Sequence, residues 1–291
     1  MPLPPLGSHM SIAGGVDKAP ARGASVGSTA MQIFVKNNNR WQGPPISAEQ
    51  AKSFRKELDA ASLAVEHVFA HTCYLINLAS PNPELGEKSV EALKDELLRC
   101  EQLGLPGLVM HPGSHVCTWR EGGIERIVAL TQRVIKETPK VKTRILFETT
   151  AGTGSNLGGP FEDIGEILRA LQRPDRVGVC MDTCHIFSAG YDIRTADTYK
   201  KTMSDFEREI GFSNLRAVHL NDSKQGLASR KDRHEHIGKG LIGEEAFRLL
   251  MRDARFAAIP MSLETEKDED LTEDRMNLET LRRLAAKETA A

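Results

Sequence analysis

Short apolar runs alternate with amphipathic segments along most of this chain. Eight of the runs read as buried strands, at residues 6–12, 30–35, 64–70, 107–110, 144–147, 177–181, 215–218 and 259–263. Helical patterns separate them, at about residues 47–63, 83–103, 124–138, 161–171, 197–210 and 244–252, and a charged helix closes the chain. Eight strand–helix units of this kind predict an α/β fold, the (β/α)8 TIM barrel.

A few residues predict where these elements begin and end. Ser47 and Gln50 have the spacing of a capping box, and Gly104 follows the last apolar position of the helix before it. Met1 to Leu6 form a proline-rich lead-in that we expect to be poorly ordered. Residues 7–10 resemble a cloning scar, but they run into a plausible strand and turn, so residues 7–291 are expected to form one domain.

Polar residues with catalytic or ligand potential stand at the right-hand ends of the apolar runs. In a (β/α)8 barrel these ends meet at one rim, where active sites lie. Taken alone, Asp182 could equally be a helix N-cap, because a carboxylate after a strand is common there. The repetition of the same pattern along the chain favours a site. The rim candidates are His9, His71, His111, Glu148, Asp182, His219 and Glu264.

Composition adds few constraints. With 38 Lys and Arg against 40 Asp and Glu, the formal charge is −2, so no global basic field points to a polyanion. The five cysteines are odd in number and scattered, and neither a secretory signal nor an apolar run long enough to cross a membrane is visible. We therefore expect a reduced, cytoplasmic protein that does not contact a membrane.

The ligand types favour a particular metal chemistry. Imidazoles and carboxylates without clustered thiolates suit Zn²⁺ or Mn²⁺; Cys180, inside an apolar run, reads as a core residue. Without His9, and counting His185, Asp232 and His234, nine candidates remain, which are too many for one ion. Three Zn²⁺ would carry six positive charges against four carboxylates, a local field that suits an anionic substrate and above all a phosphodiester.

Several motifs together resemble the endonuclease IV family of apurinic/apyrimidinic endonucleases, over nearly the whole chain. The resemblance rests on six segments, which begin at His71, His111, Glu148, Asp182, His219 and Asp232 and read HTCYLINL, HPGSH, ETTAG, DTCH, HLND and DRH. It implies a TIM barrel with three zinc ions, in which activated water attacks the phosphorus 5′ to an abasic deoxyribose and leaves a 3′-hydroxyl. Blocked 3′ ends would be trimmed by the same chemistry.

The resemblance also implies roles for individual residues. One ion would be held by His71 and His111, with Glu148 bridging to a second ion held also by Asp182, His219 and Glu264. The third ion would be held by His185, Asp232 and His234. Glu148 and Glu264 would thereby position the nucleophile and count as the catalytic pair.

Residues in the loops after the second and third strands are candidates for contact with duplex DNA. Tyr74 and Leu75 are either a loop-packing pair or, as the resemblance implies, a wedge that enters the base stack at the abasic site. The family often has Arg where this chain has Asn39, and Arg40 stands next to it. Candidates for phosphate contacts are Lys36, Arg40, Lys224, Arg230 and Arg233. We expect a monomer to be sufficient for such binding.

Two other functions stay open at this stage. Glu148, Asp182, His219 and Glu264 alone resemble the single-metal site of sugar isomerases and epimerases on a similar barrel, which would leave the remaining candidate ligands without a role. A protein that binds damaged DNA without turnover is the second. A metal count addresses the first alternative, and a nicking assay the second.

Overall fold

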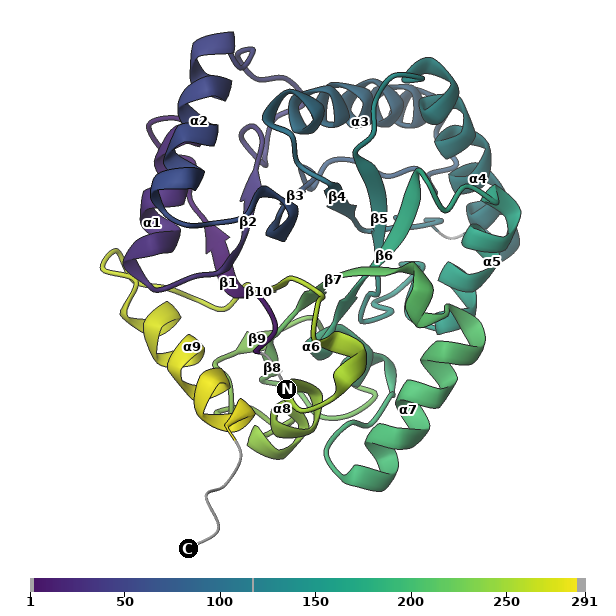
Figure 1. The fold of residues 1–291 in the computed structure, drawn as a ribbon. Coiled ribbons are helices and arrows are strands. Elements are labelled where there is room, and N and C mark those ends of the chain that lie inside the picture. The colour runs from purple at the N-terminus through teal and green to yellow at the C-terminus, as the bar shows by residue number, and fades with distance from the viewer. Residues whose placement is uncertain (1–2, 117, 287–291) are drawn as a thin grey trace, which may run out of the picture.

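The computed structural model describes residues 3–116 and 118–286, and they form a closed barrel of eight parallel strands surrounded by helices (Figure 1). The strand order around the barrel is β1-β10-β7-β6-β5-β4-β3-β2. Its strands are β1 (Leu6–Met10), β2 (Ala30–Phe34), β3 (Val68–His71), β4 (Gly107–Met110), β5 (Arg144–Glu148), β6 (Val177–Asp182), β7 (Leu215–His219) and β10 (Met261–Leu263). The predicted (β/α)8 fold is confirmed.

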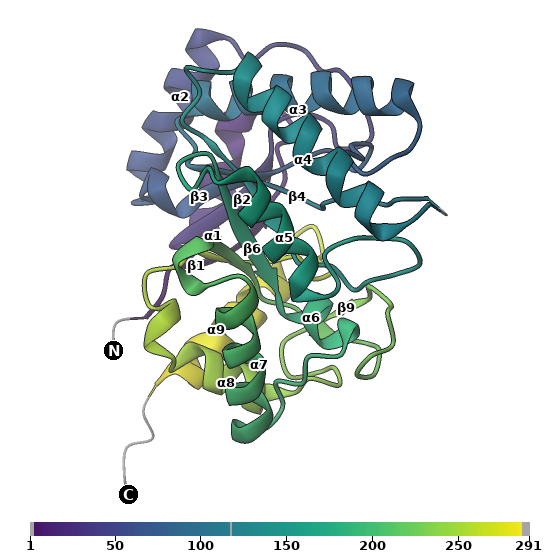
Figure 2. The ribbon, with the colours of Figure 1, turned by 90° about the vertical axis from the view of Figure 1, so that its right-hand side faces the viewer.

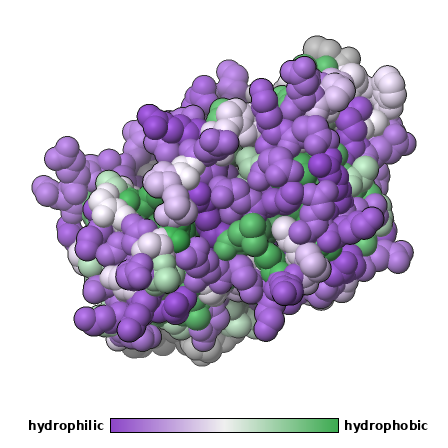
Figure 3. Space-filling view, turned by 90° about the horizontal axis from the view of Figure 1, so that it is seen from above, coloured by the Kyte–Doolittle hydropathy of each residue, from purple (hydrophilic) through white to green (hydrophobic). Residues whose placement is uncertain are grey.

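Helices ring the barrel in Figure 1, and each presents an apolar face to it. They are α1 (Ala19–Ser25), α2 (Ala48–Ala60), α3 (Pro83–Leu103), α4 (Arg120–Glu137), α5 (Phe161–Leu171), α6 (Thr183–Ala189), α7 (Ala196–Glu209), α8 (Glu244–Met251) and α9 (Thr272–Ala285). The face seen in Figure 3 is largely hydrophilic with small separate apolar areas, as expected where helices meet water.

The local signals explain where the helices begin and end. Ser47 and Gln50 form the predicted capping box at the start of α2. Gly104 ends α3 in a left-handed conformation with a φ of 82°, which a residue without a side chain adopts at little cost. The boundaries of α3 and α5 agree with the predicted ranges.

The first strand begins at Leu6, where the predicted apolar run over residues 6–12 begins. Leu6 is 1% exposed and its N–H donates to the Thr29 hydroxyl over 2.9 Å, so it does not belong to a poorly ordered lead-in. Residues 1–2 of the lead-in lie outside the described residues.

Helix α1 was not predicted. Two short elements that carry candidate site residues were also not predicted: helix α6 and a hairpin of β8 (Asp222–Ser223) and β9 (His234–Glu235). Figure 2 shows the barrel from the side, with β9 and the loop around it projecting on the right. Both elements are too short for a periodic pattern to be visible in the sequence.

The inside of the barrel is filled below the rim. Its inner layer consists of Phe69, Val109, Leu146, Cys180 and Ala217, all of them at most 2% exposed. The predicted core role of Cys180 is confirmed, and burial raises the pKa of its thiol to about 12. Polar side chains at the strand ends therefore lie directly above a packed apolar layer.

Within the described residues, none of the helices combines the length and the apolar character that a bilayer crossing requires.

Candidate metal centre

The strand ends place the predicted residues at one rim. His71, Glu148, Asp182 and His219 are the last residues of β3, β5, β6 and β7. Glu148, Asp182 and His219 are fully buried, although each is polar. Buried polar groups of this kind need partners, and here the partners are one another.

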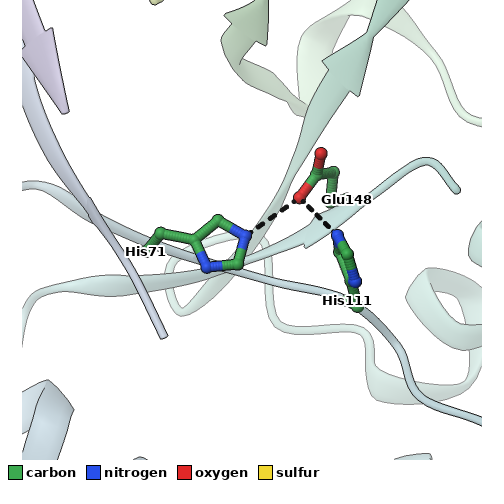
Figure 4. A group of neighbouring side chains, drawn as sticks. All are labelled: His71, His111 and Glu148. Atoms are coloured by element: carbon green, nitrogen blue, oxygen red, sulfur yellow. Dashed lines mark hydrogen bonds and ion pairs between the residues drawn. The ribbon is translucent and has the colours of Figure 1, made fainter. Parts of the chain in front are cut away.

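The first group joins three neighbouring strands. Nε2 of His71 and Nε2 of His111 lie 3.1 and 3.2 Å from the same oxygen, Oε2 of Glu148. Figure 4 shows both imidazoles pointing at this oxygen from either side. Two ligands of a tetrahedral zinc ion stand about 3.4 Å apart, so these three atoms match the edges of a coordination polyhedron.

The second group uses the other oxygen of Glu148. Oε1 lies 2.9 Å from Nδ1 of His219, and that nitrogen lies 3.2 Å from Oε2 of Glu264. Oδ2 of Asp182 is 3.8 Å from the same nitrogen. One carboxylate therefore faces two separate groups of ligand atoms.

The third group comes from the two elements that the sequence pattern missed. Nε2 of His185, in the first turn of α6, lies 3.1 Å from Oδ2 of Asp232. Nε2 of His234, in β9, lies 3.1 Å from the other oxygen of Asp232. Both nitrogens are buried and lack a hydrogen bond of good geometry, which a metal ion would remedy.

The position of Asp182 is compatible with both of its predicted roles. Its Oδ1 accepts a hydrogen bond from the backbone N–H of His185 over 2.8 Å and caps α6. Its Oδ2 faces the second group and accepts from the side-chain amide of Asn221 over 2.7 Å. The N-cap thus holds α6, and with it His185, against the rim.

The histidines are oriented by acceptors behind them. Nδ1 of His71 donates to the Thr72 carbonyl and Nδ1 of His185 to the Thr149 carbonyl, both over 2.8 Å. Nδ1 of His234 donates to the Glu264 carbonyl over 3.3 Å. Acceptors behind the ring are typical of metal-ligating histidines, because they fix the tautomer that leaves the other nitrogen free.

Mutual attraction shifts the pKa values in this site. Burial would raise the pKa of Glu148, but the charges of His219 and His111 outweigh it and hold that pKa well below its ordinary value. Burial would lower the pKa of His234, but the neighbouring carboxylates of Asp232 and Asp182 raise it to about 9. The metal-free site therefore contains an ionised Glu148 and a protonated His234 at neutral pH.

The donor set fits divalent zinc or manganese. All nine predicted ligand residues lie in three groups of close ligand atoms, and the groups contain five imidazoles and four carboxylates. Cys184 also approaches Asp182 and His234, but burial raises the pKa of its thiol to about 11 and its Sγ donates to the Arg233 carbonyl. The rim residue His9 contacts Gln32 and Glu264 and stands beside these groups.

Comparison with known proteins agrees with this geometry. Residues 20–286 match the family described as xylose isomerase-like TIM barrel. The chain is 51% identical to a probable endonuclease 4 of Chloroflexus aggregans over 282 residues, which cover 97% of this chain and 98% of the relative. A probable endonuclease 4 of Geobacter sulfurreducens is 49% identical over 98% of this chain and 95% of its own length. The crystal structure of endonuclease IV from Thermus thermophilus superposes with a TM-score of 0.84 at 34% identity, over 97% of this chain and 98% of that one.

The chain belongs to the endonuclease IV family. As a member it is an enzyme of the nuclease class. A D-tagatose 3-epimerase-like protein also superposes, with a TM-score of 0.72, but at 17% identity over 97% of this chain and 98% of that one. That likeness extends to the fold alone, so it gives no support to an isomerase.

The predicted DNA-facing residues of this endonuclease IV homologue differ in exposure. Tyr74 is 62% exposed, with its ring edge-on to Phe34 at 5.6 Å between centroids. Leu75 is partly buried and packs against the core, as its loop-packing reading predicts. The side chains of Asn39, Arg40 and Arg233 are exposed.

The prediction that Lys36 contacts a DNA phosphate is wrong. Its Nζ lies 2.7 Å from Oε1 of Glu96 on α3, and both side chains are 1% exposed. Glu96 also accepts a hydrogen bond from the backbone N–H of Cys73, next to Tyr74. Because this ammonium group is buried and paired, it stabilises two rim loops and is not available to a phosphate.

A cavity of about 970 Å³ opens beside the ligand groups, a volume typical of small-molecule sites. It is lined by ligand residues from all three groups and by the exposed ring of Tyr74.

The sequence analysis missed one of the residues that organise the site: Gln32, a buried polar residue on β2. The sequence feature that could have indicated its role is its position as a polar residue in the middle of an apolar run.

Proposed function

We propose that this chain is a zinc-dependent DNA-repair endonuclease that hydrolyses the phosphodiester 5′ to an abasic nucleotide and leaves a 3′-hydroxyl. Trimming of blocked 3′ ends would use the same site. The observation that carries the proposal is Glu148, whose two oxygens face two different groups of ligand atoms in a member of a nuclease family.

The proposed cofactor is three Zn²⁺ per chain, for which Mn²⁺ could substitute. His71, His111 and Glu148 would hold the first ion, and His185, Asp232 and His234 the third. The second would be held by Glu148, Asp182, His219 and Glu264. When bound, neighbouring zinc ions lower the pKa of water towards about 7 and stabilise the attacking and leaving oxygens of an in-line displacement.

The residues themselves supply geometry and charge. Glu148 and Glu264 hold the ligand groups at fixed separation, so the nucleophile and the scissile bond would meet in one orientation. Four carboxylates compensate only part of the charge of three divalent ions, which leaves a site that attracts a phosphodiester. The groups consist of histidines and carboxylates, and hydrolysis of this kind requires no lysine.

The proposed substrate is double-stranded DNA with an abasic site. Tyr74 stands exposed at the cavity, and we assign it to the base stack next to the extruded nucleotide. A missing base lowers the energy needed for extrusion, so abasic nucleotides would be bound in preference to intact ones. Exposed Asn39, Arg40 and Arg233 would contact the backbone. We propose that a monomer suffices and that the enzyme acts on DNA inside the cell.

A single-metal isomerase accounts for less of the geometry. It would use the group of Glu148, Asp182, His219 and Glu264 and leave no role for the other five ligand residues. His71 and His111 lie 3.1 and 3.2 Å from Glu148. His185 and His234 each lie 3.1 Å from Asp232, in positions that an isomerase would not need.

A nicking assay tests the proposal. Zinc-loaded protein is incubated with a duplex that carries one abasic analogue, and the same duplex without the lesion is the control. We expect one cut, 5′ to the lesion, with a 3′ end that a polymerase extends. A duplex with a 3′-phosphate tests the trimming activity. Binding of the lesion without a cut in the presence of Zn²⁺ would contradict the proposal.

A further inference from the structure

Gln32 is a polar residue inside the barrel, where the rest of β2 is apolar. It lies in the middle of β2 and is fully buried. An amide in such a place costs free energy unless its oxygen and both of its N–H groups find partners. Its contacts therefore indicate why it is there.

All the hydrogen-bonding capacity of this amide is directed at the rim. Its Oε1 lies 2.7 Å from Nε2 of His219, and its Nε2 lies 2.6 Å from Oε1 of Glu264. The second N–H donates to Nδ1 of His9 over 2.8 Å. The opposite orientation of the amide would place its oxygen against the Glu264 carboxylate, so the assignment follows from the chemistry.

This orientation determines the tautomer of His219. Because Oε1 can only accept, Nε2 of His219 must carry a hydrogen, so in the neutral ring that binds a metal the lone pair is on Nδ1. Nδ1 is the nitrogen that faces Glu148 and Glu264, at 2.9 and 3.2 Å. Gln32 thus presents the correct nitrogen of His219 to the second ligand group.

His219 differs from the other oriented histidines in the nature of its acceptor. His71, His185 and His234 donate to backbone carbonyls, which no substitution removes. His219 donates to a side chain. The same side chain also fixes Glu264, so one residue on β2 orients two ligands that come from β7 and the end of β10.

We propose that Gln32 is a positioning residue for the second ion: it fixes the tautomer of His219, holds Glu264 in place and so sets the affinity of that ion selectively. The inference rests on the proposed function, because it presumes that the second group binds a metal. Loss of an outer partner of this kind typically weakens metal binding about 10- to 100-fold.

The test compares wild-type protein with Q32M, which keeps the length of the side chain but loses all three hydrogen bonds. M31L is the matched control, because Met31 is the buried neighbour on β2 whose side chain belongs to the outer core. Metal content is measured after dialysis against a zinc buffer, and the visible spectrum is recorded after Co²⁺ substitution. We expect Q32M to lose one ion of the set about 10- to 100-fold more easily and to show an altered Co²⁺ spectrum, whereas M31L matches wild type.

Other outcomes are equally decisive. Equal affinity for every ion and an unchanged Co²⁺ spectrum in Q32M would overturn the inference, as would equal weakening of all ions. If Q32M does not fold, Q32E replaces it; that variant keeps an acceptor for His219 but sets a carboxyl group against Glu264, and the same selective loss is expected. Wild-type protein without bound metal would overturn the proposed function itself, and with it this inference.

Discussion

Oε1 of Glu148 lies 2.9 Å from Nδ1 of His219, and both side chains are fully buried at the ends of β5 and β7. The other oxygen of Glu148 is engaged by His71 and His111. Among the described residues, Glu148 is thus the only one that belongs to both the first and the second ligand group. Removal of its charge should therefore affect two ions at once.

We expect Glu148→Gln to abolish nicking of an abasic duplex while the fold is retained. Loss of an outer partner of a metal ligand costs up to about 100-fold, and loss of a shared ligand should cost at least that much. Nicking rate and circular dichroism check this. Glu125→Gln, an exposed change on α4, is the control. Wild-type turnover in the Glu148 variant would show that the bridging role is wrong.

Tyr74→Ala should weaken binding to the abasic duplex and leave the metal content unchanged. Stacking of a base on an aromatic ring contributes about 1–3 kcal/mol, which corresponds to a rise in Kd of roughly 5- to 150-fold. Tyr74→Phe keeps the ring and should bind nearly as well as wild type. An unaltered Kd for the Ala variant would show that Tyr74 does not stack on DNA and only packs within its loop.

Lys36→Met should destabilise the protein more than it affects DNA binding. Removal of one partner from a buried ion pair costs about 3–5 kcal/mol, because Glu96 would be left charged and unpaired. Urea unfolding measures the change. The dependence of DNA affinity on salt should stay as in wild type. In Arg40→Ala the slope of log K against log salt should decrease by about 0.9, the value for one phosphate contact. A stable Lys36 variant with a reduced salt slope would contradict the assignment.

Zinc binding should release protons at neutral pH. The pKa of His234 is raised to about 9 in the metal-free protein, so its imidazole is protonated at neutral pH and must lose a proton before it can bind a cation. Zinc affinity should consequently rise as the pH increases towards about 9, in the direction of deprotonation. Titration with Zn²⁺ in weakly buffered solution measures the release. Uptake without released protons would contradict this description of the third group.

The sequence predicted the rim well because strand ends impose the geometry. Once eight apolar runs close into a barrel, His71 and Glu148 must face the same opening, whatever their distance along the chain. For Asp182 the sequence suggested two alternatives, a helix N-cap or a site residue. In the structure one oxygen caps α6 and the other faces the ligand groups. Individual residues at strand ends therefore carried most of the information about the site.

What could not be predicted depends on packing between loops. Lys36 looked like a surface cation because its partner, Glu96, lies on a helix distant in sequence. The hairpin that carries His234 consists of two-residue strands, which leave no periodic pattern. Gln32 was missed because an isolated polar residue in an apolar run has no specific meaning until its neighbours across the barrel are known.

The central claim is that imidazoles and carboxylates from distant parts of the chain share several divalent cations. Elemental analysis of the purified protein tests it most directly, with the zinc and manganese content expressed per chain. We predict close to three ions per chain. A content close to one would contradict the account and favour a single-metal isomerase.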